Sequence, residues 1–120
     1  MNFVWVFLGG GIGAALRWVV SSNVQHNGAF PLGTFVVNMI GCLLIGILSV
    51  YLIQNTEKWN LLLVVGFLGG FTTFSSFGLD MFKLIQKEQI SILLMYFTLS
   101  NILGLIFVVL GHKATTLLIK

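Results

Sequence analysis

The sequence predicts one all-α membrane domain, residues 1–120, with four transmembrane helices of which the third is broken. Composition carries the first part of this prediction. Of the 120 residues, 58% are hydrophobic and only 8% are charged, and the mean hydropathy is +1.04. A soluble domain carries about 25% charged residues and needs them to cover its surface. The other observations are four apolar stretches of spanning length and a segment rich in glycine and threonine in the middle of the third.

The four spans follow from hydropathy and from the polar segments between them: residues 2–22, 33–53, 61–82 and 91–111. Each contains 21 or 22 residues by these bounds. At ~1.5 Å per residue this is about 32 Å of helix, which matches a hydrocarbon core of ~30 Å. The connecting segments are short, so successive helices form hairpins and both termini are expected on one side of the membrane.

The first span combines a glycine cluster with one cation. Gly9, Gly10, Gly11 and Gly13 form a small-residue face, and glycines four apart allow helix backbones to approach closely in lipid. We expect this face to pack against another helix. Arg17, near the end of the span, either snorkels to the interface or lies in a vestibule, where it would raise the local concentration of anions. No Lys or Arg precedes the apolar stretch, so a cleaved signal peptide is not expected.

The second span carries an amide side chain, Asn38, about 7 to 8 Å below the start of the span at ~1.5 Å per residue. This amide offers two donors to an anion or one hydrogen bond to a neighbouring helix. Cys42, the only cysteine, is expected to pack as a small hydrophobe. A disulfide framework or a metal site is therefore not expected.

The third span contains a candidate break at its midpoint, which falls between Phe71 and Thr72. The run from Gly69 to Thr73 places two glycines and two threonines together, a poor helical sequence. Non-helical backbone at this depth is tolerated only where it is buried in protein or lines a wet cavity, so a break here indicates function. The alternative is an unbroken helix whose threonine hydroxyls bond back to the preceding turn.

Three phenylalanines follow at three-residue spacing and are expected on one helical face: Phe71, Phe74 and Phe77, with Ser75 and Ser76 between the last two. Such a stripe commonly faces lipid or a neighbouring helix. A second interpretation uses the ring quadrupole, because the edge of an aromatic ring is electropositive and can face an anion. A pore built in this way would attract anions while carrying almost no charge.

The fourth span carries Tyr96 and Ser100 four residues apart, on a face that continues to Gly104. This face is either a hydroxyl track or a set of interhelical hydrogen bonds. At the end of the third span, Asp80 and Lys83 are three residues apart and are expected to form an exposed ion pair.

The six Lys and Arg residues divide evenly across the membrane. The side of the termini carries Lys58, Lys113 and Lys120, and the opposite side carries Arg17, Lys83 and Lys87. An excess of cations in cytoplasmic loops normally sets orientation, so two copies of a chain without this bias could insert oppositely and pair antiparallel. The alternative is that a partner or an insertion factor sets one orientation. In an antiparallel pair, carbonyls freed at residues 69–73 of both copies would meet near mid-depth and could hold a cation.

Other function classes lack their motifs in this chain. There are no paired carboxylates within a span, no cluster of metal-ligating side chains and no nucleophile beside a base, so no enzyme is expected. The glycine run that begins at Gly9 follows no strand and is not a dinucleotide-binding fingerprint. The cations form no basic run, so no nucleic-acid partner is expected.

Three segments carry a resemblance to a known family: GGGIGAALR from Gly9 to Arg17, GTFVVNMIG from Gly33 to Gly41, and GFLGGFTTFSSF from Gly66 to Phe77. In these segments, and in its length and four spans, the chain resembles the Fluc family of fluoride channels, also called CrcB. The third segment is the most specific of the three.

The resemblance implies an antiparallel, dual-topology homodimer with two pores, through which F⁻ leaves the cell passively and fluoride toxicity is relieved. It also implies a multi-pass protein of the cell membrane, the bacterial inner membrane, whose partners are a second copy, the lipid bilayer and F⁻. The family pattern assigns seven residues to the fluoride pathway: Asn38, Thr73, Phe74, Ser75, Phe77, Tyr96 and Ser100.

The resemblance further assigns the backbone carbonyls of Gly69 and Thr72 to a structural Na⁺ at the dimer centre, and Arg17 to an aqueous vestibule. The chain departs from the family pattern at two positions. Asp80 stands where the family often has a longer glutamate, and Gly104 lacks a hydroxyl that some members have.

Two rival functions are weaker. A small multidrug-type exporter has the same length and four spans, but it needs an acid in its first span, and residues 2–22 contain no Asp or Glu. A non-transporting helper subunit would need only the glycine faces. It would leave the midplane threonines and the phenylalanine stripe unexplained.

Overall fold

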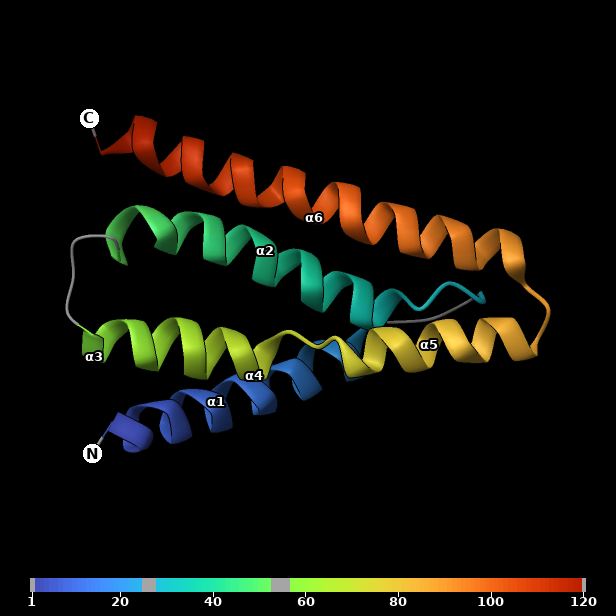
Figure 1. The fold of residues 1–120 in the computed structure, drawn as a ribbon, viewed down its shortest axis with the longest axis horizontal. Helices are drawn as coiled ribbons and strands as arrows, with labels where there is room; N and C mark the ends of the chain where they lie inside the picture. The colour runs from blue at the N-terminus through green and yellow to red at the C-terminus, as the bar shows by residue number, and fades with distance from the viewer. Residues whose placement is uncertain (1, 25–27, 53–56, 120) are drawn as a thin grey trace.

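The computed structural model describes residues 2–24, 28–52 and 57–119, and they form helices joined by short connections (Figure 1). The helical elements in chain order are α1 (Asn2–Asn23), α2 (Leu32–Leu52), α3 (Glu57–Trp59), η1 (Asn60–Leu68), α4 (Gly69–Phe71), α5 (Ser75–Gln86) and α6 (Ile90–Leu118). Four stretches are long and apolar enough to cross a membrane: Asn2–Asn23, Leu32–Tyr51, Glu57–Gln86 and Ile90–Leu118. The prediction of an all-helical chain with four spans is therefore confirmed. Ile53, the predicted end of the second span, lies outside the described residues.

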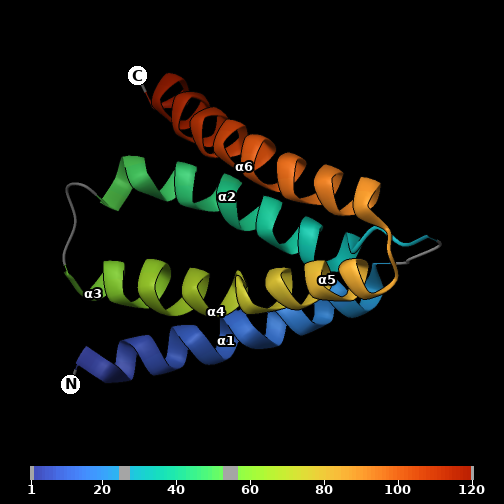
Figure 2. The same cartoon turned by 45° about the vertical axis from the view of Figure 1, so that its right-hand side comes forward.

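The helices form two side-by-side pairs, α2 with α6 and α1 with the η1–α4 part of the third span (Figures 1 and 2). Both chain ends lie at the same end of the molecule, as the hairpin prediction requires (Figure 1). At that end, Lys58 Nζ lies 4.3 Å from the centre of the Trp5 ring and so links the start of the third span to α1.

Glycine faces bring α1 into backbone contact with the third span, as predicted. A Cβ atom on Gly13 would meet the Phe67 carbonyl oxygen and would stand 2.9 Å from the Phe71 nitrogen. A Cβ atom on Gly70 would stand 2.5 Å from the Gly10 oxygen. Gly11 does not belong to this face, because nothing lies within 4 Å of the corresponding position. The prediction that all four glycines of the cluster share the packing face is therefore wrong for Gly11.

The fourth helix is longer than predicted, because it continues from Gly111 to Leu118 without a helix-breaking residue. Its 29 residues extend about 44 Å at ~1.5 Å per residue, more than the ~30 Å of the hydrocarbon core. Glycines again allow close packing, since a Cβ atom on Gly111 would stand 2.5 Å from the Leu43 oxygen. The Ser49 hydroxyl lies 2.9 Å from His112 Nδ1 and ties the same two helices together.

The third span changes its backbone conformation twice. Residues Asn60–Leu68 form a π-helix, which is rare at this length. The helix then ends at Phe71, Thr72 is extended with φ −83° and ψ 161°, and α5 begins at Ser75. The Thr72 hydroxyl does bond back to the Leu68 carbonyl at 2.8 Å, as the unbroken alternative expected, although its backbone leaves the helix.

Candidate functional site

The non-helical residues Thr72–Phe74 are held in place by Asn38 of α2. Asn38 Nδ2 donates to the Thr73 carbonyl at 3.0 Å, and the Thr73 N–H donates to Asn38 Oδ1 at 2.9 Å. The amide thus replaces both backbone partners that Thr73 would have in a regular helix. A Cβ atom on Gly41, one turn further along α2, would meet Thr72 Cγ2, so α2 lies directly against these residues. Of the two roles expected for Asn38, the hydrogen bond to a neighbouring helix is present.

The same hydrogen bonds leave two carbonyl groups without their helical donors. In a continuous helix, the N–H of Thr73 would bond to the Gly69 carbonyl and the N–H of Ser76 to the Thr72 carbonyl. Here the Thr73 N–H bonds to Asn38, and the Ser76 N–H bonds to the Thr73 hydroxyl oxygen at 3.1 Å. The carbonyls of Gly69 and Thr72 are therefore available to a ligand.

These two carbonyls are the pair that the family resemblance assigns to Na⁺. Hard cations bind oxygen ligands, and free backbone carbonyls suit an alkali-metal ion. Among residues 2–24, 28–52 and 57–119, no group of three His, Cys, Asp or Glu side chains lies close enough to hold a metal ion. Backbone oxygens are thus the donors that fit a cation at this break.

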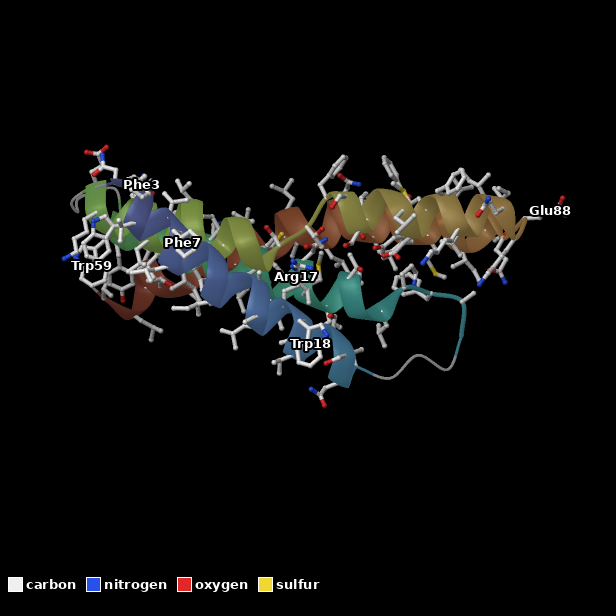
Figure 3. All side chains as sticks on the ribbon, turned by 90° about the horizontal axis from the view of Figure 1, so that it is seen from below. Phe3, Phe7, Arg17, Trp18, Trp59 and Glu88 are labelled. Carbon is white, nitrogen blue, oxygen red and sulfur yellow. The ribbon has the colours of Figure 1, made fainter. Side chains whose placement is uncertain are left out.

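Arg17 of α1 also contacts the break. Its Nε donates to the Gly70 carbonyl at 3.0 Å, and the side chain is partly buried. Figure 3 shows Arg17 directed from α1 toward the other helices, whereas the neighbouring Trp18 lies on the outside. The helices α1 and α2, both distant in sequence from the break, therefore each supply a polar side chain to it.

A cavity of about 510 Å³ lies beside the break, between α2, the third span and α6. It brings together most of the predicted site residues: Asn38, Gly69, Thr72, Thr73, Phe74, Phe77 and Ser100. Three predicted residues do not line it: Arg17, Ser75 and Tyr96. The cavity is open and not enclosed, and none of its lining residues carries a formal charge.

The phenylalanine stripe is divided by the break. Phe71 is 3% exposed and stacks on Phe67, with ring centroids 5.8 Å apart. Phe74 is 81% exposed and Phe77 is 7% exposed, and their centroids lie 6.0 Å apart at 47°. The prediction that all three rings share one helical face is wrong, because the helix ends at Phe71 and the chain changes direction before Phe74.

Tyr96 lies fully buried behind this cavity. Its hydroxyl donates to Asp80 Oδ2 at 3.1 Å, and its ring centroid lies 4.9 Å from that of Phe77. Asp80 therefore reaches the fourth helix despite its shorter side chain. The carboxylate thus bonds across to Tyr96, a partner that the prediction of an ion pair with Lys83 did not include. Tyr96 and Ser100 share a helical face, but only Ser100 lines the cavity.

Sequence reasoning missed several lining residues, notably Gly41, Cys42, Ile45 and Asn101. The first three follow Asn38 at helical spacing, so the position of the amide on α2 was a signal that could have found them. Cys42 also explains a departure from the family pattern. A Cβ atom on Gly104 would stand 3.3 Å from Cys42 Sγ, so the fourth helix has little room for a side chain there.

Comparison with known proteins shows to which family the chain belongs. A family model described as "CrcB-like protein, Camphor Resistance (CrcB)" matches residues 4–112. A "Fluoride-specific ion channel FluC" of Helicobacter pylori (strain Shi470) is 44% identical over 119 residues, covering 92% of this chain and 92% of that protein. A protein of the same name from Hydrogenobaculum sp. (strain Y04AAS1) is 44% identical over 116 residues, covering 93% and 95%. The chain belongs to the CrcB family.

Proposed function

We propose that this protein is a fluoride channel, not an enzyme, and that it lets F⁻ leave the cell passively and so relieves fluoride toxicity. The observation that carries the proposal is the uncharged cavity at the break, which gathers an amide, an exposed ring and hydroxyls: Asn38, Phe74, Thr73 and Ser100. The relatives named as fluoride-specific ion channels supply the identity of the ion.

Partial charges would hold the anion in this cavity. The edge of the Phe74 ring is electropositive. Asn38 Nδ2 has a second hydrogen beyond the one donated to Thr73, and the Ser100 hydroxyl adds a further donor. Ser75 does not line the cavity, but its hydroxyl lies 3.5 Å from that of Thr73, which does. Weak binding at several such points suits conduction, because an ion must be able to leave each of them.

Phe77 and Tyr96 would form the wall of the pathway. Both are buried, and their packing at 4.9 Å fixes the Phe77 ring beside Phe74. The hydroxyl hydrogen of Tyr96 is donated to Asp80, so we assign Tyr96 to the pathway only through its ring, which packs against Phe77. Arg17 would attract anions toward the entrance from a vestibule.

A single chain does not enclose this pathway, so we propose that two copies pair antiparallel and form two pores. The 81% exposure of Phe74 and the open cavity support a second copy at this face. The even division of the cations permits opposite insertion. In such a pair, the interruptions of the two broken third helices would meet at mid-depth.

The carbonyls of Gly69 and Thr72 from both copies would then hold a structural Na⁺. Its chemical contribution is a positive charge that offsets the dipoles of the converging carbonyls. Asn38 and the Thr73 hydroxyl would keep these carbonyls free by engaging the two N–H donors that would otherwise bond to them. The assembly would lie in the cell membrane, the inner membrane of a bacterium.

The test is fluoride release from liposomes that contain the purified protein, measured with a fluoride electrode. We expect F⁻ to leave down its gradient much faster than Cl⁻. Phe74→Ile should reduce the F⁻ flux at least about ten-fold, because it removes the ring edge without changing the backbone. Well-folded protein that releases no F⁻ would refute the proposed function.

Phe7→Ile is the matched control. Phe7 is 78% exposed on α1, close to the exposure of Phe74, but it does not line the cavity. Its replacement should leave the flux unchanged. An equal loss of flux in the two variants would mean that the Phe74 effect reflects general damage to the fold.

A further inference from the structure

Arg17 continues the glycine face that packs α1 against the third span. Gly10, Gly13 and Arg17 are spaced by three and four residues and therefore lie on one side of the helix. A Cβ atom on Gly70 would stand 2.5 Å from the Gly10 oxygen, so α1 packs against the third span here with no room for a side chain on Gly70. Arg17 lies two turns beyond Gly10, and from there its side chain reaches the carbonyl of Gly70.

The helical run that ends at Phe71 has carbonyls at its end that need donors. The Leu68 carbonyl accepts from the backbone and the hydroxyl of Thr72, at 2.9 Å and 2.8 Å. The Gly70 carbonyl accepts from Arg17. The Gly69 carbonyl lies between these two in sequence, and the donor that it would have in a continuous helix bonds to Asn38 instead. The carbonyls of Leu68 and Gly70 thus each accept a hydrogen bond, whereas the Gly69 carbonyl between them has lost its helical donor to Asn38.

The two glycines make this cap important. Glycine allows backbone rotations that other residues do not. The backbone dihedral angles of Gly69 and Gly70 are therefore not restricted by side chains of their own. A cation at the C-terminal end of a helix also interacts favourably with the partial negative charge there. The Arg17 hydrogen bond therefore supplies a restraint that the local sequence lacks.

We propose that Arg17 is a positioning residue for the cation-binding backbone: through Nε it fixes the Gly70 peptide and so keeps the Gly69 carbonyl oriented and free. The consequence for the cation rests on the proposed function, whereas the restraint on the backbone does not. This role depends on a donor at the Nε position. The vestibule role depends on positive charge alone, so substitutions can separate the two.

Three variants separate donor from charge. In Arg17→Gln, the side-chain amide nitrogen stands as many bonds from the backbone as Nε does, so a donor remains and the charge is lost. Arg17→Met has similar length with neither donor nor charge. Arg17→Lys keeps the charge but carries its nitrogen one atom further out and lacks the planar geometry of the guanidinium.

The measurement is hydrogen–deuterium exchange of peptides that cover residues 66–79 in the full-length protein. We expect exchange in Arg17→Met to be at least about five-fold faster than in the wild type, and exchange in Arg17→Gln to stay within about two-fold of it. Arg17→Lys should lie between them. Peptides from residues 106–116, where α6 packs on α2 and which do not line the cavity, serve as the internal control and should be unchanged.

Other results would overturn the proposal. If Arg17→Lys is protected like the wild type and Arg17→Gln exchanges like Arg17→Met, charge and not the Nε donor orders the break. If no variant changes exchange, Arg17 does not position this backbone. Should Arg17→Met fail to fold, the order of Arg17→Gln and Arg17→Lys still decides between donor and charge.

A second readout concerns the cation directly. The Na⁺ concentration at which the stabilisation of the dimer reaches half of its maximum should rise at least about five-fold in Arg17→Met and by less in Arg17→Gln. A wild-type dimer that does not respond to Na⁺ would refute the proposed cation site and leave the exchange result valid. Wild-type protein that releases no F⁻ would refute the proposed function and likewise leave the exchange result valid.

Discussion

The hydrogen bonds between Asn38 and Thr73 allow a quantitative test of the interrupted helix. Asn38→Leu keeps a side chain of similar size and removes both bonds, which measure 3.0 and 2.9 Å. Each bond contributes about 0.5–1.5 kcal/mol net, so the expected loss is about 1–3 kcal/mol in the free energy of unfolding. Asn38→Asp keeps the acceptor but places a second carboxylate oxygen against the Thr73 carbonyl. We expect this variant to lose at least the contribution of one hydrogen bond, about 0.5–1.5 kcal/mol, in the free energy of unfolding.

The assay is equilibrium unfolding in detergent, followed by tryptophan fluorescence. The matched control is Asn101→Leu, because Asn101 also lines the cavity, and its side-chain nitrogen donates to the Phe97 carbonyl within its own helix, at 2.8 Å. Its replacement should change the free energy of unfolding by less than about 0.5 kcal/mol. If Asn38→Leu unfolds like Asn101→Leu, Asn38 does not hold the third span in the way argued above.

Further predictions concern packing, the buried hydroxyl and the cation. Gly13→Ala should lose about 1–3 kcal/mol in the free energy of unfolding, because its Cβ would meet the backbone of the third span, whereas Gly11→Ala, which meets nothing within 4 Å, should lose nothing. Asp80→Leu should lose about 1–3 kcal/mol by leaving the buried Tyr96 hydroxyl without its acceptor. Adding Tyr96→Phe should restore most of that loss, and additive losses in a double-mutant cycle would contradict this. Replacing Na⁺ by a large organic cation should shift the monomer–dimer equilibrium toward monomer by about ten-fold or more, and an unchanged equilibrium would count against a bound cation.

The four spans could be predicted because they depend on local quantities. A stretch of about 20 apolar residues must be helical in lipid, since every backbone group needs an internal partner. The bounds of α1 and α2 therefore agree with the prediction to within one residue wherever the structure describes them. The glycine contacts of α1 could likewise be predicted from spacing, except that spacing alone did not show that Gly11 faces away.

Predictions that depended on which side chains meet were less successful. Asp80 and Lys83 are neighbours on one helix, yet the carboxylate pairs with Tyr96 from another helix. The three phenylalanines have regular spacing, yet Phe71 is 3% exposed and Phe74 is 81% exposed. In each case a contact from outside the segment overrode the local pattern.

The sequence by itself determined that this is a four-helix membrane protein of a recognisable family, with a weak point for helix formation in the middle of its third span. Only the tertiary structure decided how that weak point is built: Asn38 engages both backbone groups of Thr73, and Arg17 caps the Gly70 carbonyl. The physical reason is range. Hydropathy and glycine spacing act within one helix, whereas the donor that a freed carbonyl finds depends on which helices lie beside it and at what depth.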